Sequence, residues 1–415
     1  MTAISDETDR PGATAATAAA PWRDHCAMLV CAMTGFSSLY LTQSLGGELQ
    51  RLHGLSVQQC AALLTATTLG LALASPLAGL LVQQLGLRRA LVVGLTLLGL
   101  LDAGLAVAGG FAELLVLRAM QGAAMPMVLS ALLAGIERQP STRTALGMSA
   151  TYVMGTVCGG IVGRLLPASL IPSFGWSAAF LAMALLHGIA LLLALALAFK
   201  GSGPARQPAG DERSRRRGYG AWSLPAVYAG GFALLFSQIA VFTFIAFRLA
   251  EPPFGWSTAM LGSLYLVFLP SLVFLHGTRR VVSRIGHGRT VAAAALLSWI
   301  GLLMTLAGSA LPVVAGLVVF STAVFFVQAV LAHALSLCGG ASGARASGGY
   351  LFFYYLGGSL GSLVPALLWQ RFGWAGCLAL IALLQLAAAG LIRLANARAR
   401  PAPASSATHN TLGEN

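Results

Sequence analysis

The sequence contains very few charged residues. Only 9% of its 415 residues are Asp, Glu, Lys or Arg, and only 12 are acidic, whereas a soluble domain carries about 25% charged residues. Hydrophobic residues make up 57% of the chain. This composition excludes a soluble globular protein, because too little polar surface is available to cover one. It predicts an integral membrane protein.

The sequence also lacks the residue patterns that most enzymes and sensors need. Its six cysteines show no Cys-x-x-Cys or Cys/His spacing, so neither a disulfide framework nor a metal site is indicated. There is no phosphate-binding glycine loop and no nucleophile with a base at usable spacing. The runs between the apolar segments are too short for a soluble output domain. We therefore expect no enzymatic activity, no metal and no cofactor.

Apolar runs of membrane-spanning length fill most of the chain. The first residues, MTAISDETDR, are acidic, unlike the start of a cleaved signal peptide, so we expect the first run to be retained. We predict an all-α polytopic membrane protein with disordered cytoplasmic tails at 1–22 and 396–415. Between them we expect six-helix bundles at 23–199 and 222–395 and a cytoplasmic linker at 200–221. The twelve expected spans are 24–46, 57–82, 88–109, 111–135, 145–169, 175–198, 222–247, 256–276, 289–308, 310–333, 344–368 and 374–395.

The distribution of basic residues predicts the orientation in the membrane. With the N-terminus in the cytoplasm, most of the 25 Lys and Arg residues fall in cytoplasmic segments, and only Arg51, Arg248 and Arg371 fall outside. The positive-inside rule therefore puts both termini in the cytoplasm. The net charge of +13 is then a topology signal, so we expect no nucleic-acid partner. The Arg215–Arg217 run fits a solvated topology signal or binding to anionic lipid headgroups.

The two halves resemble each other at a spacing of about 200 residues. Because each half holds an even number of spans, the copies share one orientation and are related by an axis along the membrane normal. Such a pair can rock about a site held between them, as alternating access requires, whereas a channel or membrane enzyme has less need of the duplication. The matched residues are Gly86 with Gly286, Pro167-Ala168 with Pro365-Ala366, Phe174-Gly175-Trp176 with Phe372-Gly373-Trp374, and Arg143, Tyr152, Gly155 and Gly159 with Arg345, Tyr354, Gly357 and Gly361.

With twelve spans, two parallel halves and a basic central linker, the chain resembles the major facilitator superfamily over residues 24 to 395. The family signature between spans two and three, G-x-L-x-D-R-x-G-R-R/K, occurs here with Gln83 at its acidic position. In the family the acidic residue helps to latch the cytoplasmic side, so the resemblance implies a weaker latch here. The other matching positions are Gly79, Gly86, Arg88 and Arg89.

Other motifs are similar to those of exporters in this family. Arg118-x-x-Gln121-Gly122 matches the fourth-span motif of drug and sugar exporters, in which the arginine is linked to proton coupling. The stripe Gly155, Gly159 and Gly163 in span five, followed by Arg164, resembles an antiporter motif, and close helix packing explains such a stripe about as well. Tyr40-x-x-Gln43 and the run 350–355 resemble a bacterial branch of arabinose-efflux-like permeases.

Asp102 and Arg118 are the groups expected to couple transport to protons. An arginine inside a span costs roughly 2.5–3.5 kcal/mol, so it usually faces a bundle interior or a water-filled cavity. Asp102 lies about eight residues before the turn between spans three and four, and Arg118 about eight after it, so both sit about 12 Å from that turn. A pair at this depth fits a proton-release step or a permanent structural ion pair, and Arg118 by itself also fits a purely structural tie.

The family's cavity is lined by spans 1, 4, 7 and 10, with spans 2, 5, 8 and 11 beside them. His187 and His333 are possible proton carriers but, as lone histidines on apolar helices, are left out of the site. Arg164 and Arg248 are expected to snorkel at the outer edge. The candidate substrate-binding residues are Tyr40, Gln43, Arg118, Gln121, Tyr152, Gln238, Tyr265, Gln328 and Tyr354.

The resulting prediction is a secondary transporter of the bacterial inner membrane, driven by the proton gradient. We expect a monomer that exports a small molecule such as a drug, a sugar or a siderophore-like metabolite, with the lipid bilayer as its other partner. Arg118 favours substrates with an anionic or oxygen-rich group. An importer of the same fold, coupled to protons or facilitative, is the alternative.

Overall fold

The computed structural model describes residues 22–139, 142–196, 223–271, 287–338 and 343–398, together with Val281 and Arg284. These residues form helices and short connections, without strands. The expected linker lies outside them, as does nearly all of both expected tails. The helices of the first half are α1 (Trp22–Ser37), η1 (Ser38–Tyr40), α2 (Gly46–His53), α3 (Val57–Leu85), α4 (Leu87–Val107), α5 (Phe111–Glu137) and α6 (Thr142–Ala196). Those of the second are α8 (Leu224–Ala250), α9 (Thr258–Ser263), η2 (Leu264–Phe268), α12 (His287–Met304), α13 (Ala310–Cys338) and α14 (Gly343–Arg398).

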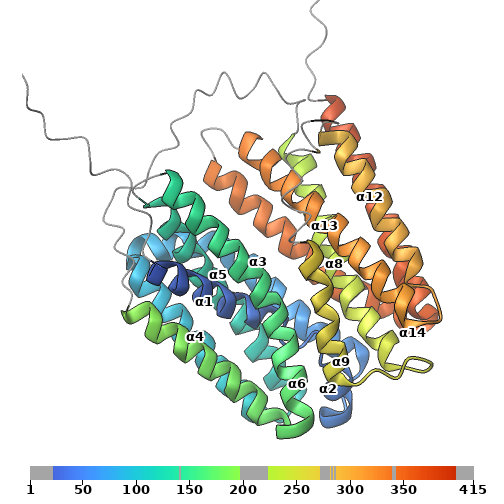
Figure 1. Cartoon of the computed structure of the whole chain (residues 1–415), viewed down its shortest axis with the longest axis horizontal. Helices are drawn as coiled ribbons and strands as arrows, with labels where there is room; N and C mark the ends of the chain where they lie inside the picture. Colours follow the sequence, from blue (N-terminus) through green and yellow to red (C-terminus); the bar gives the residue numbers. More distant parts are fainter. Residues whose placement is uncertain are drawn as a thin grey trace, which may run out of the picture.

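The described helices overlap all twelve expected spans. Seven helices of the described residues are each long and apolar enough to cross a bilayer, and two of these, α6 and α14, are long enough for two spans each. The remaining spans correspond to the shorter helices α1, α9 and α12. Figure 1 shows the first half, in blue and green, beside the second half, in yellow, orange and red. The all-helical membrane fold predicted from the sequence is confirmed.

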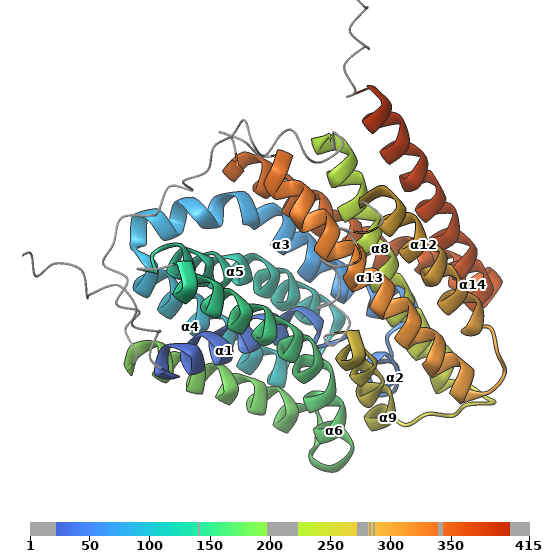
Figure 2. The ribbon, with the colours of Figure 1, turned by 45° about the horizontal axis from the view of Figure 1, so that its top comes forward.

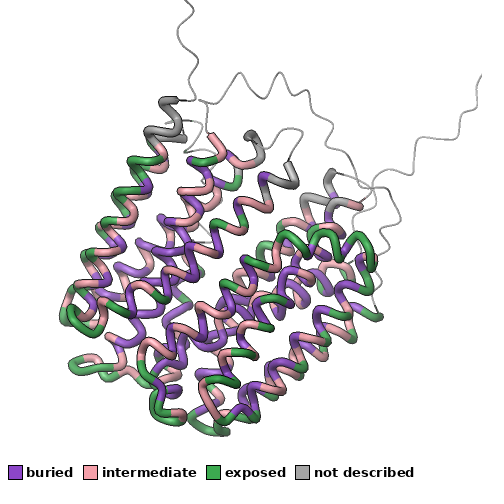
Figure 3. Tube along the Cα trace, turned by 180° about the vertical axis from the view of Figure 1, so that it is seen from behind, coloured by how far each residue is buried: buried purple, intermediate pink, exposed green. Residues whose placement is uncertain are grey.

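The outer surface of the bundle is apolar, as a lipid-facing surface must be. Large side chains such as Leu73, Leu100, Leu185 and Leu383 are more than half exposed. A soluble protein rarely exposes so many large apolar groups together. Buried residues follow the inner sides of the helices, and exposed residues the periphery and the ends (Figure 3). The apolar periphery places the chain in a bilayer as a multi-pass protein.

Each of the two long helices turns sharply at a glycine of the repeated Phe-Gly-Trp sequence. Gly175 has φ +82° in α6 and Gly373 has φ +55° in α14, a region that residues with a Cβ rarely enter. The adjacent tryptophans anchor both turns, because Trp176 Nε1 donates to the carbonyl of Leu105 (2.8 Å) and Trp374 Nε1 donates to Thr305 Oγ1 (3.0 Å). The repeat seen in the sequence therefore builds the same corner twice.

The glycine stripes of spans five and eleven serve the same packing contact in both halves. A Cβ on Gly159 of α6 would overlap the carbonyl oxygen of Met33 in α1, and one on Gly361 of α14 would overlap that of Phe236 in α8. Gly155 and Gly357 meet the carbonyls one helical turn earlier, at Leu29 and Phe232. Span five therefore packs against span one in the same way as span eleven packs against span seven. The structure thus shows the close helix packing expected of the stripe, and its role in antiport stays a prediction.

We expect Gly159→Val to destabilise the protein by about 1–3 kcal/mol, the usual range for overpacking, because α1 and α6 must separate to admit the side chain. The midpoint of thermal unfolding in detergent measures the effect. Gly188→Val is the matched control on the same helix, since a Cβ at Gly188 meets nothing within 4 Å. Equal melting of the two variants would contradict the packing role of the stripe.

The two halves close against each other at one end of the bundle, where α2 and α9 lie together in Figures 1 and 2. Hydroxyl pairs join α3 to α14: Thr65 Oγ1 lies 2.7 Å from Ser362 Oγ, and Thr68 Oγ1 lies 2.9 Å from Ser359 Oγ. Nearby, Thr258 Oγ1 donates to Glu48 Oε1 over 2.9 Å. These contacts involve the ends of spans one, two, eight and eleven that lie farthest from the expected cytoplasmic tails.

Span one is interrupted, contrary to the continuous span expected at 24–46. Its α-helix ends at Ser37, a 3₁₀ turn follows to Tyr40, and a turn leads into α2. A broken helix leaves carbonyl groups without intrahelical donors, and inside a bilayer other groups must supply them. The break lies at the closed end. The side chains that donate hydrogen bonds to its free carbonyl groups are therefore candidates for a role in transport.

Candidate transport site

Arg118 supplies hydrogen-bond donors to the carbonyl groups at the interruption of span one. Its side chain is fully buried, and its guanidinium donates to the carbonyls of Ser38 (2.6 Å) and Leu39 (2.7 Å). Nη1 also donates to Gln121 Oε1 over 2.6 Å. The planar fork of arginine suits two adjacent carbonyl oxygens, which a lysine cannot bind in the same way. Arg118 thus holds α5 to the interrupted segment of span one.

Asp102 does not form the expected direct ion pair with Arg118. Gln121 stands between them, because its Nε2 donates to Asp102 Oδ1 over 2.6 Å while its Oε1 accepts from Arg118. The two charges stay within electrostatic range of each other. The sequence predicted that Asp102 and Arg118 lie close together in the membrane. In the structure the side-chain amide of Gln121 lies between them and binds the carboxylate.

The titratable side chain nearest to Asp102 is His187, which was left out of the site predicted from the sequence. Oδ2 of Asp102 lies 2.9 Å from Nδ1 of His187, an ion-pair distance without the alignment of a hydrogen bond. Both side chains are fully buried. Nδ1 also lies 3.1 Å from the carbonyl of Met183, and Nε2 lies 3.2 Å from Ser38 Oγ. Because a carbonyl only accepts, these partners assign a proton to Nδ1.

Arg164 does not snorkel, which corrects the expectation for this span. Its side chain is 2% exposed, and its Cζ lies 3.7 Å from the ring centroid of Tyr40 and 4.3 Å from that of Tyr265. Nε donates to Gln43 Oε1 over 2.8 Å. Nε2 of Gln43 in turn donates to Thr243 Oγ1 in α8 over 3.0 Å. The arginine therefore lies between the two halves rather than at the lipid boundary.

Tyrosines from both halves gather around Tyr40. Tyr354 and Tyr355 lie within electrostatic range of Tyr40, and Tyr355 also of Tyr152. Tyr350 stacks on Tyr354 with ring centroids 5.7 Å apart. Within the described residues, the hydroxyls of the four tyrosines around Tyr40 make no protein hydrogen bond, although a buried tyrosine hydroxyl usually finds one.

The structure connects only part of the predicted site. Tyr40, Gln43 and Tyr265 meet at Arg164, Tyr354 lies within electrostatic range of Tyr40, and Tyr152 lies within range of Tyr355. Gln238 is buried in α8 and Gln328 half-buried in α13, and neither makes a side-chain hydrogen bond in the part of the chain that the structure covers. The side chain of His333 is outside the described atoms. The roles of all these residues in transport stay predictions.

The signature between spans two and three is exposed at the other end of the bundle. Gly86, with φ +80°, separates α3 from α4, and Gln83, Arg88 and Arg89 are exposed there. Arg88 Nη2 donates to the carbonyl of Leu195 in α6 over 3.0 Å. Its described side-chain hydrogen bond thus stays within the first half, and the weaker latch expected from Gln83 stays a prediction.

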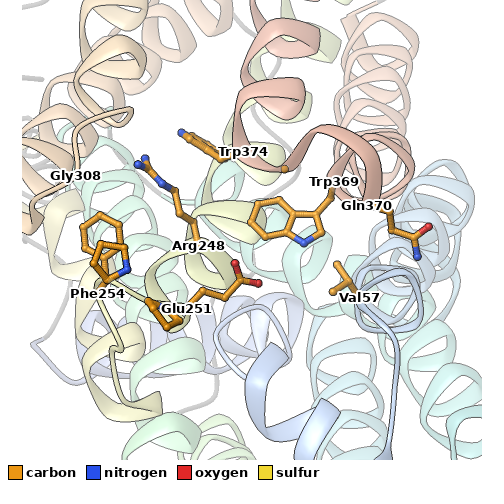
Figure 4. A pocket seen from close by; sticks show the side chains of 11 residues that line it. Val57, Arg248, Glu251, Phe254, Gly308, Trp369, Gln370 and Trp374 are labelled. Carbon is orange, nitrogen blue, oxygen red and sulfur yellow. The ribbon is translucent and has the colours of Figure 1, made fainter.

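A cleft of about 560 Å³ opens at the closed end but lacks all the predicted substrate-binding residues. It lies between the start of α3 and the outer turns of the second half, with Arg248, Glu251, Phe254 and Trp369 around it (Figure 4). The guanidinium of Arg248 donates to the carbonyls of Leu306 and Ala307, each at 3.0 Å. The cleft is separate from the Asp102 and Arg164 clusters.

The family follows from a comparison with known protein families. The model described as Major Facilitator Superfamily matches residues 26–336, well over half of the chain. The chain belongs to this superfamily. It is therefore a secondary transporter that acts on a small molecule, and not an enzyme.

Relatives within the superfamily are bacterial. The chain is 26% identical over 366 residues to the inner membrane transport protein YnfM of Escherichia coli K12, covering 86% of this chain and 87% of the relative. It is also 26% identical over 366 residues to the uncharacterized MFS-type transporter YybF of Bacillus subtilis, covering 85% and 88%. Neither name gives a substrate or a direction.

Solved structures of the superfamily confirm the fold. A bacterial homologue of the human lysosomal transporter Spinster, inward-facing and occupied, superimposes with a TM-score of 0.69 at 14% identity, covering 92% of this chain and 98% of the other. Its inward-facing, unoccupied form gives 0.67 at 14% identity, covering 93% and 100%. At this identity the likeness concerns the fold alone.

Proposed function

We propose that this superfamily member exports a small organic molecule across the bacterial inner membrane in exchange for protons. The network of Asp102, His187, Gln121 and Arg118 carries the proposal, because its contacts run without interruption from a buried acid to the break in span one. With both termini in the cytoplasm, the closed end faces the periplasm. The described state is then open toward the cytoplasm, where an exporter takes up its substrate.

Proton uptake at Asp102 changes the hydrogen bonds that hold the interrupted segment of span one. A proton bound to the carboxylate removes its charge, so Oδ1 becomes a weaker acceptor for Gln121 Nε2 and no longer compensates Arg118. Gln121 and Arg118 then rearrange against the Ser38 and Leu39 carbonyls. His187 is able to pass the proton on, because Ser38 Oγ can donate to Nε2 of the neutral ring and accept from the charged ring. The break lies beside the closed end. Because exchange carries the proton inward, protonation of Asp102 from the periplasm favours closing this end, and release of the proton to the cytoplasm as substrate binds favours opening it.

Asp102→Asn is the decisive test. In everted vesicles acidified by ATP hydrolysis, an exchanged substrate added outside dissipates the pH gradient, which a fluorescent dye reports. A compound screen with an overproducing strain supplies the substrate. We expect Asp102→Asn to lower the initial rate of dissipation at least tenfold, within the range of general acid–base effects, and His187→Gln to lower it as well.

Glu113→Gln is the matched control, since this carboxylate on α5 is exposed and only caps the backbone N–H of Gly109 (2.8 Å). It should exchange protons at the wild-type rate. Unchanged dissipation in Asp102→Asn would refute the coupling role. If every transported compound instead deepens the acidification, protons and substrate move in the same direction, and the protein is an importer.

A further inference from the structure

Arg164 is a buried cation held at the junction of the two halves. It lies in α6 of the first half, whereas Tyr265, whose ring centroid is 4.3 Å from its Cζ, lies in η2 of the second. Phe268 of the same 3₁₀ helix is 5.6 Å away. Since Tyr40 covers the guanidinium from the first half, aromatic rings from both halves form its surroundings.

The hydrogen-bonding capacity of this guanidinium is only partly used. Nε donates to Gln43, and Nη1 donates to the carbonyl of Gly160 over 2.5 Å. Arginine has five such donors in a fixed plane. Within the described part of the chain, no carbonyl accepts from Nη2 or from the second N–H of Nη1, and no carboxylate lies within 4 Å of Arg164. The remaining partners of the guanidinium are the phenol groups of Tyr40 and Tyr265. Arg164 therefore has neutral acceptors but no carboxylate, which a ligand could supply in their place.

Arg118 provides the internal comparison. Its donors bind two backbone carbonyls and Gln121, and Asp102 lies in electrostatic range. The charge of Arg118 is thus compensated within the protein by Asp102, although its Nε has no hydrogen-bond partner among the described residues. From the sequence, the preference for an anionic substrate was expected at Arg118. The contacts favour Arg164 for that role, because a buried charge without a counterion calls for one.

The surroundings also indicate the shape of the missing partner. The guanidinium lies among the aromatic rings of Tyr40, Tyr265 and Phe268, and the side chains of Tyr354 and Tyr355 lie within electrostatic range of Tyr40. A carboxylate binds a guanidinium edge through two parallel N–H···O bonds. Aromatic walls suit a flat apolar body attached to that carboxylate.

We propose that Arg164 binds the carboxylate of a small organic acid with an aromatic or apolar body, packed between the two halves. As a statement about substrate, this inference depends on the export function proposed above. It carries one further consequence. An anion that leaves while a proton enters moves positive charge inward twice per cycle, so export would be accelerated by a membrane potential that is negative inside.

Binding to the purified full-length protein tests the site without any gradient. Benzoate and phenylacetate are titrated against benzamide and phenylacetamide, which match them in shape but lack the charge, and the thermal unfolding midpoint is recorded. We expect only the carboxylates to raise the midpoint of the wild type. Arg164→Gln should weaken the apparent affinity at least tenfold, and Arg164→Lys should weaken it less, because the charge stays while the fork is lost.

Arg248→Gln is the matched control, since it removes the same charge from an arginine that binds only the carbonyls of Leu306 and Ala307; it should keep the wild-type response. If Arg164→Gln does not fold, Arg164→Lys replaces it, and benzoate is expected to raise its unfolding midpoint less than that of the wild type at the same concentration. Equal effects of acids and amides, no effect of the acids, or unaltered binding in a folded Arg164→Gln protein overturn the proposal.

Different experimental results would overturn the proposed export function and the proposed carboxylate site. Proton exchange that depends on Asp102 but serves only neutral or cationic compounds overturns the carboxylate site and leaves the exporter standing. Carboxylate binding that depends on Arg164, without proton-linked movement of any bound acid, keeps the site and overturns proton-coupled export.

Discussion

Joining positions 65 and 362 in the double variant Thr65→Cys/Ser362→Cys is expected to abolish transport when the new thiols are oxidised. The two hydroxyl oxygens lie 2.7 Å apart across α3 and α14, so thiols at these positions would face each other across the two helices. A covalent bond there prevents the closed end from opening, and alternating access requires it to open. The assay is substrate uptake by proteoliposomes, in a background where the six native cysteines are replaced.

Reduction with dithiothreitol should restore uptake, which separates cross-linking from a folding defect. The single variants Thr65→Cys and Ser362→Cys should transport equally well before and after treatment with the same oxidant. Full activity of the oxidised double variant, with the disulfide verified by mass spectrometry, would mean that this end does not open during transport.

Replacing Arg118 with alanine is expected to destabilise the protein more than Gly159→Val or any substitution of Arg164. It leaves the carbonyls of Ser38 and Leu39 without donors, at about 1–3 kcal/mol each. It also removes the donor to Gln121 and the positive charge within electrostatic range of the buried Asp102. We expect unfolding well below the wild-type temperature in detergent and no measurable transport.

Arg248→Ala is the appropriate comparison, because this arginine also donates to two adjacent carbonyls but lies at the solvent-facing end of α8, where water replaces its hydrogen bonds. Its unfolding temperature should change little. Arg118→Lys should fall between the two, since an ammonium group keeps the charge but not the fork. If Arg118→Ala melts like the wild type, the break in span one does not depend on this side chain.

Much of the fold was predictable from the sequence, because the membrane imposes simple rules on it. Runs of apolar residues located the spans, and the paired Phe-Gly-Trp and glycine positions located the two halves. What the spacing could not give was the break in span one. Residues 38–45, SLYLTQSL, read as an ordinary apolar helix. The donors that stabilise the interruption come from Arg118 of span four, which no local pattern in span one reveals.

Arg164 was placed too close to the membrane boundary because the predicted end of span five was too early. Span five was expected to end at residue 169, which puts Arg164 five residues from the boundary and suggests snorkelling. The helix instead continues to the turn at Gly175. Arg164 then lies about 16 Å from that turn, at 1.5 Å per residue. The depth of His187 could have been predicted in the same way, since it lies about 18 Å from this turn on the other side, near the depth of Asp102.

The hydroxyl pairs between α3 and α14 also bear on how evenly the two states are populated. Neutral hydrogen bonds contribute about 0.5–1.5 kcal/mol each to a folded state, so the Thr65–Ser362 and Thr68–Ser359 pairs together hold the closed end by an amount comparable to a tenfold to hundredfold population ratio. A ligand or proton that prefers the other state by a similar factor is enough to reverse the balance. An end sealed by threonine and serine can therefore respond to small differences in binding, where an end sealed by buried ion pairs would stay shut.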